Sequence, residues 1–511
     1  MIARVETTAL LGIDAFTVDL EVDLARSGMP AFCMVGLAEG AVRESKERVF
    51  SALKNSGFKL PPSRITVNLA PADVRKEGSG YDLPLALGLL AGAGEIPEHA
   101  LRGYYMAGEL SLSGELRPVT GILPMAIKAR DMQAKALFVP RQNAAEAAVV
   151  KGLTVLPLDS LSQSIRFFLG ETTIEPASSD LDSLWALREE HHVDFSEVKG
   201  QEHAKRAIEI AAAGAHNLLF LGPPGSGKTM LAKRIPTVLP PLGFDEALEV
   251  TKIYSVAGHL KSDPMIVSRP FRSPHHTISD AGLIGGGQYP KPGEVSLAHR
   301  GVLFLDELPE FKKHVLEVLR QPLEDGHVTI SRAAVSLSYP ADFMLVAAMN
   351  PCPCGYLGDE RHPCICTPSQ IQRYRSRLSG PLLDRIDLQV EVPAVPYKEL
   401  RQNTGSLDSA TMRTRIGAAR AIQAHRYQDT PLLTNAQLSG KWLQQFCPLG
   451  DTEHAFLESA VKRLGLSARA FTRILRIART IADLSGDHAI NIHHLAEAIN
   501  YRSLDRQNES F

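Results

Sequence analysis

The sequence predicts an α/β fold arranged as two α/β domains followed by a mostly helical C-terminal region. Three patterns lead to this prediction. Strand-like and helix-like segments alternate over residues 1–170, and a glycine-rich loop near residue 222 joins an apolar run to a helix-forming segment. From about residue 393 onward, apolar residues recur with helical spacing. At 511 residues the chain is too long for one hydrophobic core, which agrees with several domains.

The composition is that of a globular protein without a membrane-spanning or secretory segment. Apolar residues make up 44% and charged residues 22% of the chain, both ordinary values. The longest apolar stretch, residues 83–93, is too short to cross a bilayer and predicts a buried helix. The first residues show no signal-peptide pattern, so we expect a cytoplasmic protein. The formal net charge of −2 leaves any nucleic-acid binding to local basic patches.

The first domain, residues 1–170, is predicted from strand and helix patterns that follow one another. Residues 16–22 and 64–69 have the alternation of strands, and an amphipathic helical pattern lies between them. Residues 171–193 are polar and acidic, as expected for an exposed linker. The second domain is therefore predicted to extend over residues 194–392.

The chemistry of the second domain begins at a loop that follows an apolar run, residues 217–221. The loop has all the fixed positions of a phosphate-binding P-loop, which are Gly222, Gly227, Lys228 and Thr229. Pro223, Pro224, Gly225 and Ser226 lie between them. Backbone N–H groups of such a loop converge on phosphate oxygens, the lysine neutralises their charge, and the threonine hydroxyl binds Mg²⁺. A glycine-rich turn before a helix is the plain alternative, but the strand, loop and helix context favours ATP and Mg²⁺ as cofactors.

Two further apolar runs end in polar residues that suit the same site. Residues 301–305 lead into Asp306 and Glu307, and residues 343–349 lead into Asn350. Asp306 can hold Mg²⁺, and Glu307 can polarise an attacking water. The Asn350 amide can hold that water or the γ-phosphate. Without the P-loop, the acids would predict only a solvated turn, and an asparagine before proline only a turn residue.

Four cysteines form two close pairs, Cys352-x-Cys354 and Cys364-x-Cys366, with nine residues between the pairs. Four thiolates so placed can enclose a tetrahedral Zn²⁺. The Cys-x-Cys spacing is tighter than the usual two-residue gap, so reduced thiols without a metal are the alternative.

Several segments together resemble the magnesium-chelatase-like branch of the AAA+ ATPase superfamily, and within it the YifB/ComM family. They are residues 198–201, 213–217, 269–276, 285–287, 291–301 and 350–355. The resemblance covers essentially the whole chain, including the N-terminal domain, which points to the YifB/ComM family rather than to the chelatase ATPase subunit. It implies a homo-hexameric ring in which each ATP lies between neighbouring subunits.

The resemblance also implies roles for two arginines. Arg385 matches the arginine finger, which reaches the γ-phosphate of the neighbouring subunit. Arg469 matches the sensor-2 position of a helical lid, residues 393–511. A surface ion pair is the alternative for each arginine. Within the lid, the sequence predicts helices at residues 410–427, 451–464, 468–484 and 492–501.

The chain between the P-loop and the second strand is longer than a strand-helix-strand unit needs, so residues 252–298 are predicted to hold an insertion. The resemblance implies a helix-2 insert and a hairpin before sensor 1, both facing the pore of the ring. Residues 285–291 and 327–337 match these segments. Lys291 and Arg332 would then contact DNA phosphates. Ordinary surface charges are an equally good interpretation of both residues.

The N-terminal domain resembles the proteolytic domain of Lon-type proteases, through residues 76–78, 108–110 and 138–143. Lon-type hydrolysis needs a serine nucleophile activated by a lysine. Gly80 stands at the serine position and Leu123 at the lysine position, while Ser79 is one residue out of register. We therefore expect a scaffold without the catalytic dyad.

Two functions remain open from the sequence. The resemblance to the YifB/ComM family implies a hexameric ATP-dependent DNA motor, a helicase or branch migration factor acting on single-stranded and branched duplex DNA. Such a motor would promote recombination-based integration of DNA in natural transformation. The alternative is a chelatase-like or chaperone-like ATPase that remodels a protein partner. The missing dyad weakens a third function, proteolysis.

Overall fold

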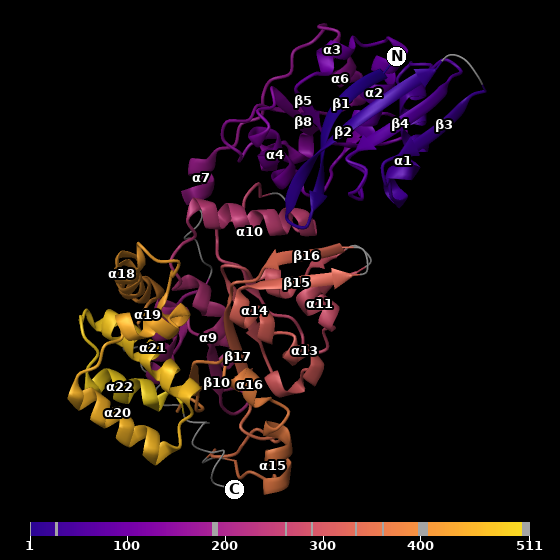
Figure 1. Cartoon of the computed structure of the whole chain (residues 1–511). Coiled ribbons are helices and arrows are strands. Elements are labelled where there is room, and N and C mark those ends of the chain that lie inside the picture. Colours follow the sequence, from indigo (N-terminus) through magenta and orange to yellow (C-terminus); the bar gives the residue numbers. More distant parts are fainter. Residues whose placement is uncertain are drawn as a thin grey trace. The chain divides into compact units, whose positions relative to one another are not determined.

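The computed structural model describes residues 2–25, 29–186, 193–260, 263–287, 290–332, 335–359, 362–396 and 407–502, with only the backbone described at positions 332 and 335. The chain divides into two compact units, and both are of the predicted α/β class (Figure 1). The N-terminal unit comprises Met1–Leu187 together with Gly243–Val267, and the second unit comprises Arg188–Leu242 together with Ser268–Phe511. None of the described helices is long and apolar enough to span a membrane.

A seven-stranded mixed sheet forms the centre of the N-terminal unit. Its strands are β1 Ile2–Leu11, β2 Asp14–Ala25, β3 Ala31–Val35, β4 Arg64–Ala70, β5 Tyr104–Met106, β8 Ala136–Pro140 and β9 Val155–Leu158. Their order in the sheet is β3-β4-β2-β1-β5-β8-β9. β2 pairs antiparallel with β1 and β4, and the other pairs are parallel. β6 Glu109–Leu110 and β7 Leu116–Arg117 form a separate hairpin. The predicted strands at residues 16–22 and 64–69 are confirmed within β2 and β4.

Seven short to medium helices accompany this sheet in residues 40–186. They are α1 Gly40–Asn55, α2 Asp82–Ala93, α3 Glu98–Leu101, α4 Ile122–Asp131, α5 Ala144–Ala147, α6 Leu161–Phe168 and α7 Leu181–Ala186. The buried helix predicted at residues 83–93 is confirmed as α2, which contacts β1 and β2. A Cβ at Gly92 would lie 2.6 Å from Leu24 Cδ1, so glycine allows the helix to lie close to the sheet.

The helix α10, Phe244–Ala257, belongs to the N-terminal unit although the P-loop precedes it in the chain. It packs against α4, and Ser255 Oγ donates a hydrogen bond of 2.5 Å to Glu146 Oε1. The amide of Gly121 donates to the carbonyl of Ser255 at 3.1 Å. The sequence assigned all of residues 194–392 to one ATPase core, whereas the structure groups Gly243–Val267 with the N-terminal unit. The reason is this side-chain and backbone bonding to α4, which helical periodicity alone does not reveal.

A five-stranded parallel sheet forms the centre of the second unit. Its strands are β10 Leu218–Leu221, β11 Phe271–Arg272, β14 Val302–Leu305, β17 Met344–Met349 and β18 Leu388–Glu391, in the order β11-β14-β17-β10-β18. The three predicted apolar strands are confirmed as β10, β14 and β17, and every residue in them is buried. Because all five strands are parallel, the residues that follow β10, β14 and β17 gather at one edge of the sheet.

The remaining helices belong to the second unit. They are α8 Glu202–Gly214, α9 Lys228–Arg234, α11 Asp280–Ile284, α12 Glu294–Leu297, α13 Lys313–Glu317, α14 Arg320–Asp325, α15 Pro368–Arg375, α16 Gly380–Leu383, α18 Ser409–Tyr427, α19 Gly440–Phe446, α20 Asp451–Leu464, α21 Ala468–Ser485 and α22 Ile492–Asn500. The four helices predicted after residue 393 are confirmed as α18, α20, α21 and α22, with ends within one residue of the prediction. α18 and α21 pack on α8, so this helical region shares a hydrophobic core with the sheet.

Two hairpins complete the second unit. β12 Gly285–Gly286 pairs with β13 Lys291–Pro292, and β15 His327–Arg332 pairs with β16 Val335–Pro340. Both hairpins are antiparallel. The alternating pattern at residues 327–337 is therefore confirmed as two paired strands.

Candidate nucleotide site at the carboxyl edge of the parallel sheet

The P-loop joins the end of β10 to the start of α9, as its motif predicts. Gly225 and Gly227 have φ angles of +75° and +94°, in the left-handed region that glycine adopts without strain. Gly222 has a different constraint, because a Cβ there would lie 2.1 Å from the carbonyl oxygen of Val392. A P-loop needs glycine where its backbone comes close to the phosphates. The structure shows a second reason for glycine at position 222, because a larger residue would clash with the backbone that follows β18.

The Lys228 side chain lies inside the P-loop and is held by neutral oxygens. Its Nζ donates to the carbonyls of Gly222 and Pro223 at 2.7 and 2.9 Å, and to Asn350 Oδ1 at 3.2 Å. Burial lowers the pKa of Lys228, although the charges of Asp306 and Glu307 oppose this effect. Neutral partners leave the positive charge of the ammonium uncancelled, so the position favours an anion such as a phosphate.

A hydroxyl and a carboxylate meet beside this lysine. Thr229 Oγ1 donates to Asp306 Oδ2 at 2.7 Å, and the Glu307 amide donates to Asp306 Oδ1 at 2.9 Å. Hydroxyl and carboxylate oxygens are the protein ligands that Mg²⁺ accepts in nucleotide sites. Lys228, Thr229, Asp306, Glu307 and Asn350, predicted from three separate strands, thus lie in one cluster at the carboxyl edge of the sheet.

Glu307 has a partner that the sequence analysis did not assign. His276 Nδ1 lies 3.2 Å from Glu307 Oε2, and the Glu307 side chain is 57% exposed. Glu307 also has a left-handed backbone, with a φ of 53°, which is uncommon for a residue with a Cβ. His276 follows β11, an edge strand of the same parallel sheet. The sequence carried one signal for His276, its place at the end of the family-like segment 269–276, because β11 is too short to show a strand pattern.

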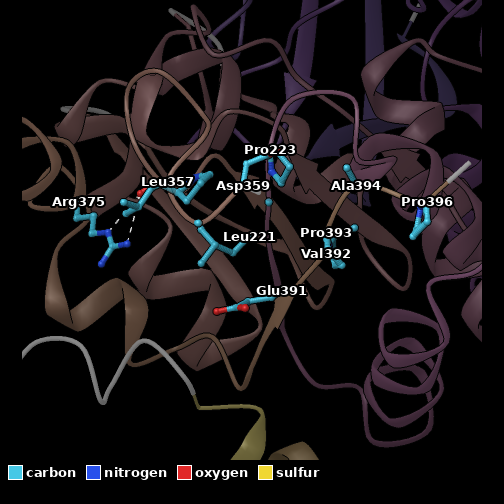
Figure 2. Close-up of a pocket in the computed structure, with 13 residues that line it drawn as sticks. Leu221, Pro223, Leu357, Asp359, Arg375, Glu391, Val392, Pro393, Ala394 and Pro396 are labelled. Carbon is cyan, nitrogen blue, oxygen red and sulfur yellow. Dashed lines mark hydrogen bonds between the residues drawn. The ribbon is translucent and has the colours of Figure 1, made fainter. Parts of the chain in front are cut away.

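A cavity of about 440 Å³ lies beside the P-loop (Figure 2). Pro223 lines it together with Leu357 from the cysteine-containing loop and Val392 after β18. Arg375 lines the same cavity and donates to the carbonyl of Pro351 at 3.4 Å. The cavity therefore connects the P-loop to the loop that follows Asn350.

Arg385 lies away from this cluster, at the opposite edge of the sheet. It precedes β18, and its backbone carbonyl accepts a hydrogen bond of 2.9 Å from Asn217 Nδ2, just before β10. Its guanidinium is only 11% exposed, pairs with Glu324 and donates to the carbonyl of Pro381 at 2.5 Å. Since β10 and β18 are parallel, Arg385 is at their amino ends, whereas the P-loop is at the carboxyl end of β10.

Arg469 and the two proposed DNA contacts lie elsewhere in the second unit. Arg469, at the start of α21, is 73% exposed and forms an ion pair of 3.0 Å with Asp384. Lys291 is exposed on β13. The Arg332 side chain lies outside the described residues, although its backbone ends β15.

The four clustered cysteines come together as predicted. Their sulfur atoms all lie within 4.8 Å of one another, and Cys352 is buried. Hydrogen bonds from the amides of Tyr356 and Ile365 lower the pKa of Cys354 to about 6, whereas burial raises the pKa of Cys366 to about 12. Without a cation among them, the four thiols therefore do not all ionise at neutral pH.

Gly80 and Leu123, which the resemblance to Lon-type proteases predicts at the dyad positions, both form hydrogen bonds through their backbones. The Gly80 carbonyl accepts from the Gly108 amide at 3.0 Å, and the Leu123 amide donates to Glu146 Oε1 at 2.9 Å. Leu123 is fully buried. Lys76, a nearby lysine in sequence, is buried and its Nζ donates to the carbonyls of Val74, at 2.7 Å, and of Pro71.

Comparison with known families covers most of the chain. Residues 194–400 match the family described as magnesium chelatase, subunit ChlI, and residues 406–502 match its C-terminal family. Residues 20–143 match a family described as subunit ChlI of Mg-chelatase.

Individual relatives match over nearly the full length. The competence protein ComM of Haemophilus influenzae is 46% identical over 509 residues, covering 99% of this chain and 98% of ComM. The YifB protein of Escherichia coli is 45% identical and covers 98% of this chain and 97% of its own. A magnesium-chelatase 38 kDa subunit of Acidiphilium rubrum is 24% identical, and the match covers 59% of this chain and 87% of the subunit. Because these matches extend over nearly the full length and the P-loop lies at the carboxyl edge of the parallel sheet, the chain belongs to the YifB/ComM family of magnesium-chelatase-like AAA+ proteins.

Proposed function

We propose that the protein is an ATP-hydrolysing, hexameric DNA motor that drives branch migration during integration of DNA in natural transformation. The observation that supports ATP chemistry most directly is the cluster of Lys228, Thr229, Asp306 and Asn350 at the end of three parallel strands. The pathway rests on the match to a competence protein, 46% identical over 99% of this chain.

Each residue of the cluster has a separate role in ATP hydrolysis. The P-loop amides and Lys228 hold the β- and γ-phosphates, while Thr229 and Asp306 bind Mg²⁺, which neutralises charge on the phosphates. Glu307 orients and polarises the attacking water, with His276 positioning its carboxylate. Asn350, which already contacts Lys228, senses the γ-phosphate.

The placement of Arg385 supports a site that is shared between subunits, and the family resemblance supplies the number six. An arginine at the amino edge of the sheet serves a phosphate bound at the carboxyl edge of a neighbouring copy more readily than one in its own chain. In a head-to-tail ring, each Arg385 would leave Glu324 and complete the next subunit's site, stabilising charge in the transition state. Hydrolysis would then depend on contact between subunits.

DNA would be held by local basic residues, because the chain has a formal net charge of −2. Lys291 on β13 and Arg332 at the end of β15 are the proposed phosphate contacts, and each lies on a hairpin. The N-terminal unit would act as a scaffold without proteolytic chemistry, since Gly80 and Leu123 replace the dyad.

A junction assay tests this proposal. Purified protein is mixed with a labelled three- or four-stranded DNA junction, with and without ATP, and strand exchange is followed on a native gel. Wild-type protein should migrate the junction only with ATP. Lys228→Ala and Glu307→Gln should abolish migration, and Glu307→Gln should still bind DNA in the presence of ATP. Absence of DNA binding with ATP at low salt would refute the motor.

A second function, remodelling of a protein partner, is supported by the matches to magnesium-chelatase families over residues 194–400 and 406–502. It predicts ATP hydrolysis that DNA does not stimulate. A Zn²⁺ ion at the cysteine cluster is compatible with either function.

A further inference from the structure

The loop after β17 brings four cysteines to one point beside the P-loop. Cys352 follows Asn350 by one intervening residue, and Cys354, Cys364 and Cys366 complete the group. Their sulfur atoms lie within 4.8 Å of one another. Two further cysteines, Cys33 and Cys447, are free and lie outside this group.

The spacing of the sulfur atoms fits a tetrahedral metal. Zn–S bonds of about 2.3 Å place the sulfurs of a ZnS₄ site about 3.8 Å apart. Cys352 Sγ lies 3.3 Å from Cys354 Sγ and 3.7 Å from Cys364 Sγ, and Cys354 Sγ lies 3.6 Å from Cys364 Sγ. Four sulfur ligands in this arrangement select zinc or an iron–sulfur centre over oxygen-seeking metals such as Mg²⁺.

Two of the four sulfurs accept hydrogen bonds from backbone amides. The amide of Cys354 donates to Cys366 Sγ, and the amide of Cys366 donates to Cys364 Sγ, both at 3.4 Å. Hydrogen bonds of this kind orient metal-binding thiolates and stabilise their charge. Four thiolates this close repel one another without a cation between them, so the arrangement requires a metal or protonation.

The cysteine loop is packed directly against the P-loop. A Cβ at Gly355, whose φ is +89°, would lie 2.6 Å from Pro224 Cδ. The carbonyl of Pro351 accepts from the Arg375 guanidinium, and Asn350 Oδ1 accepts from Lys228 Nζ at 3.2 Å. The position of the cysteine loop therefore sets the position of Asn350 at the phosphate site.

We propose that Cys352, Cys354, Cys364 and Cys366 bind one structural Zn²⁺, and that this ion holds Asn350 in contact with Lys228. The ion would join the two cysteine pairs, which flank a segment that contains Gly355 and Gly358. Loss of the ion releases the turn and displaces the Asn350 amide. The effect of zinc on hydrolysis rests on the proposed ATPase function, whereas zinc binding itself does not.

Metal content tests the site independently of activity. Full-length protein, purified without chelator, is analysed for zinc and iron by mass spectrometry and then for Co²⁺ binding by visible absorption. One zinc per chain is expected, with Co²⁺ giving the thiolate charge-transfer band of a tetrahedral sulfur site. Cys364→Ser with Cys366→Ser should lose both signals, while Cys33→Ser with Cys447→Ser should keep them. Metal-free protein, iron in place of zinc, or zinc retained by the Cys364→Ser/Cys366→Ser variant would overturn the site.

The link to hydrolysis is tested by reversible zinc removal. Wild-type protein is treated with a zinc-selective chelator, assayed for ATP hydrolysis in excess Mg²⁺, and then supplied with Zn²⁺. The rate should fall roughly 10-fold, as expected for a displaced catalytic contact, and recover with Zn²⁺. Lys228→Ala should retain zinc without hydrolysis. An unchanged rate after verified zinc loss overturns the positioning role. Stoichiometric zinc in a protein that never hydrolyses ATP refutes the proposed function and leaves the metal site intact.

Discussion

The two units share the α/β class but differ in how they use buried polar groups. In the second unit, the buried Lys228 bonds only neutral oxygens, and the exposed Thr229 hydroxyl beside it donates to the Asp306 carboxylate, so charge remains available for a ligand. In the N-terminal unit, Lys76 and Glu146 are buried and bonded to the unit's own backbone and side chains. Two units of the same fold class therefore differ in whether a buried charge is left for a ligand or is bonded within the unit, and a few side chains decide this.

The largest expected effect is loss of the proposed arginine finger. Arg385→Ala should lower kcat for ATP hydrolysis by about 10³–10⁵-fold, the range for arginines that stabilise transition-state charge. Steady-state hydrolysis by the assembled protein measures this effect. The matched control is Arg141→Ala in the N-terminal unit, which removes an ion pair of 2.6 Å with Asp159. Equal rates for the two variants would exclude the finger and leave Arg385 as the Glu324 partner only.

Two buried aspartates allow a comparison of stability between the units. Burial raises the pKa of Asp387, but Arg473 and His216 outweigh it and hold the pKa well below its usual range. Burial keeps the pKa of Asp82 above its usual range despite the Arg48 partner. Asp387→Asn should therefore cost about 3–5 kcal/mol of local stability, the usual loss when a buried pair is broken. Asp82→Asn should cost less.

Hydrogen exchange in the β10 and β18 peptides, and in α2 for Asp82→Asn, measures these losses. Because the folded pKa of Asp387 is depressed, its stabilisation is present above about pH 4 and is lost as the pH falls further. The gap between wild type and Asp387→Asn should therefore close in acid. A loss for Asp82→Asn as large as that for Asp387→Asn would contradict the comparison.

A smaller effect is expected from the histidine that contacts Glu307. His276→Ala should lower kcat by roughly 10-fold with little change in KM, because the carboxylate that orients water loses its positioning partner. His276→Asn retains a hydrogen-bond donor and should recover part of the rate. His327→Ala, which removes a contact of 3.0 Å to the carbonyl of Asp325, is the control. Identical kinetics for the His327 and His276 variants would refute positioning.

No effect on activity is expected when Ser79 is replaced, although it lies next to Gly80, the position that the Lon resemblance assigns to the serine nucleophile. Ser79→Ala should leave ATP hydrolysis and junction migration unchanged, and added peptide substrates should stay uncleaved. The backbone carbonyl of residue 79 accepts from the Asp82 amide at 3.3 Å, and alanine retains this contact. Incubation with a fluorescent casein or peptide substrate and ATP measures proteolysis. ATP-dependent cleavage that disappears in Ser79→Ala would make the N-terminal unit a catalytic one.

Local patterns were sufficient to predict which residues lie at the carboxyl edge of the parallel sheet, where the candidate nucleotide site is. Continuous apolar runs marked β10, β14 and β17, and the polar residue after each run fell at the same edge because the strands are parallel. The Cys-x-Cys pairs likewise predicted a cluster, since short spacing keeps two sulfurs close whatever the surrounding fold.

Long-range packing could not be predicted in the same way. The helical pattern of α10 did not reveal its partner, because its Ser255 bonds Glu146, a residue 109 positions away. His276 was missed because β11 has only two residues, Phe271–Arg272, too few for a strand pattern. The placement of Arg385 at the amino edge depends on the pairing of β18 with β10, which no local pattern contains.

The most direct test of the proposed DNA motor is the rate of ATP hydrolysis by the wild-type protein with and without branched DNA. The measurement is made at low salt and repeated as salt is raised. DNA should increase the rate, salt should remove the increase, and Lys228→Ala should show no hydrolysis in either case. A rate that is the same with and without DNA at low salt would contradict the DNA motor and favour remodelling of a protein partner.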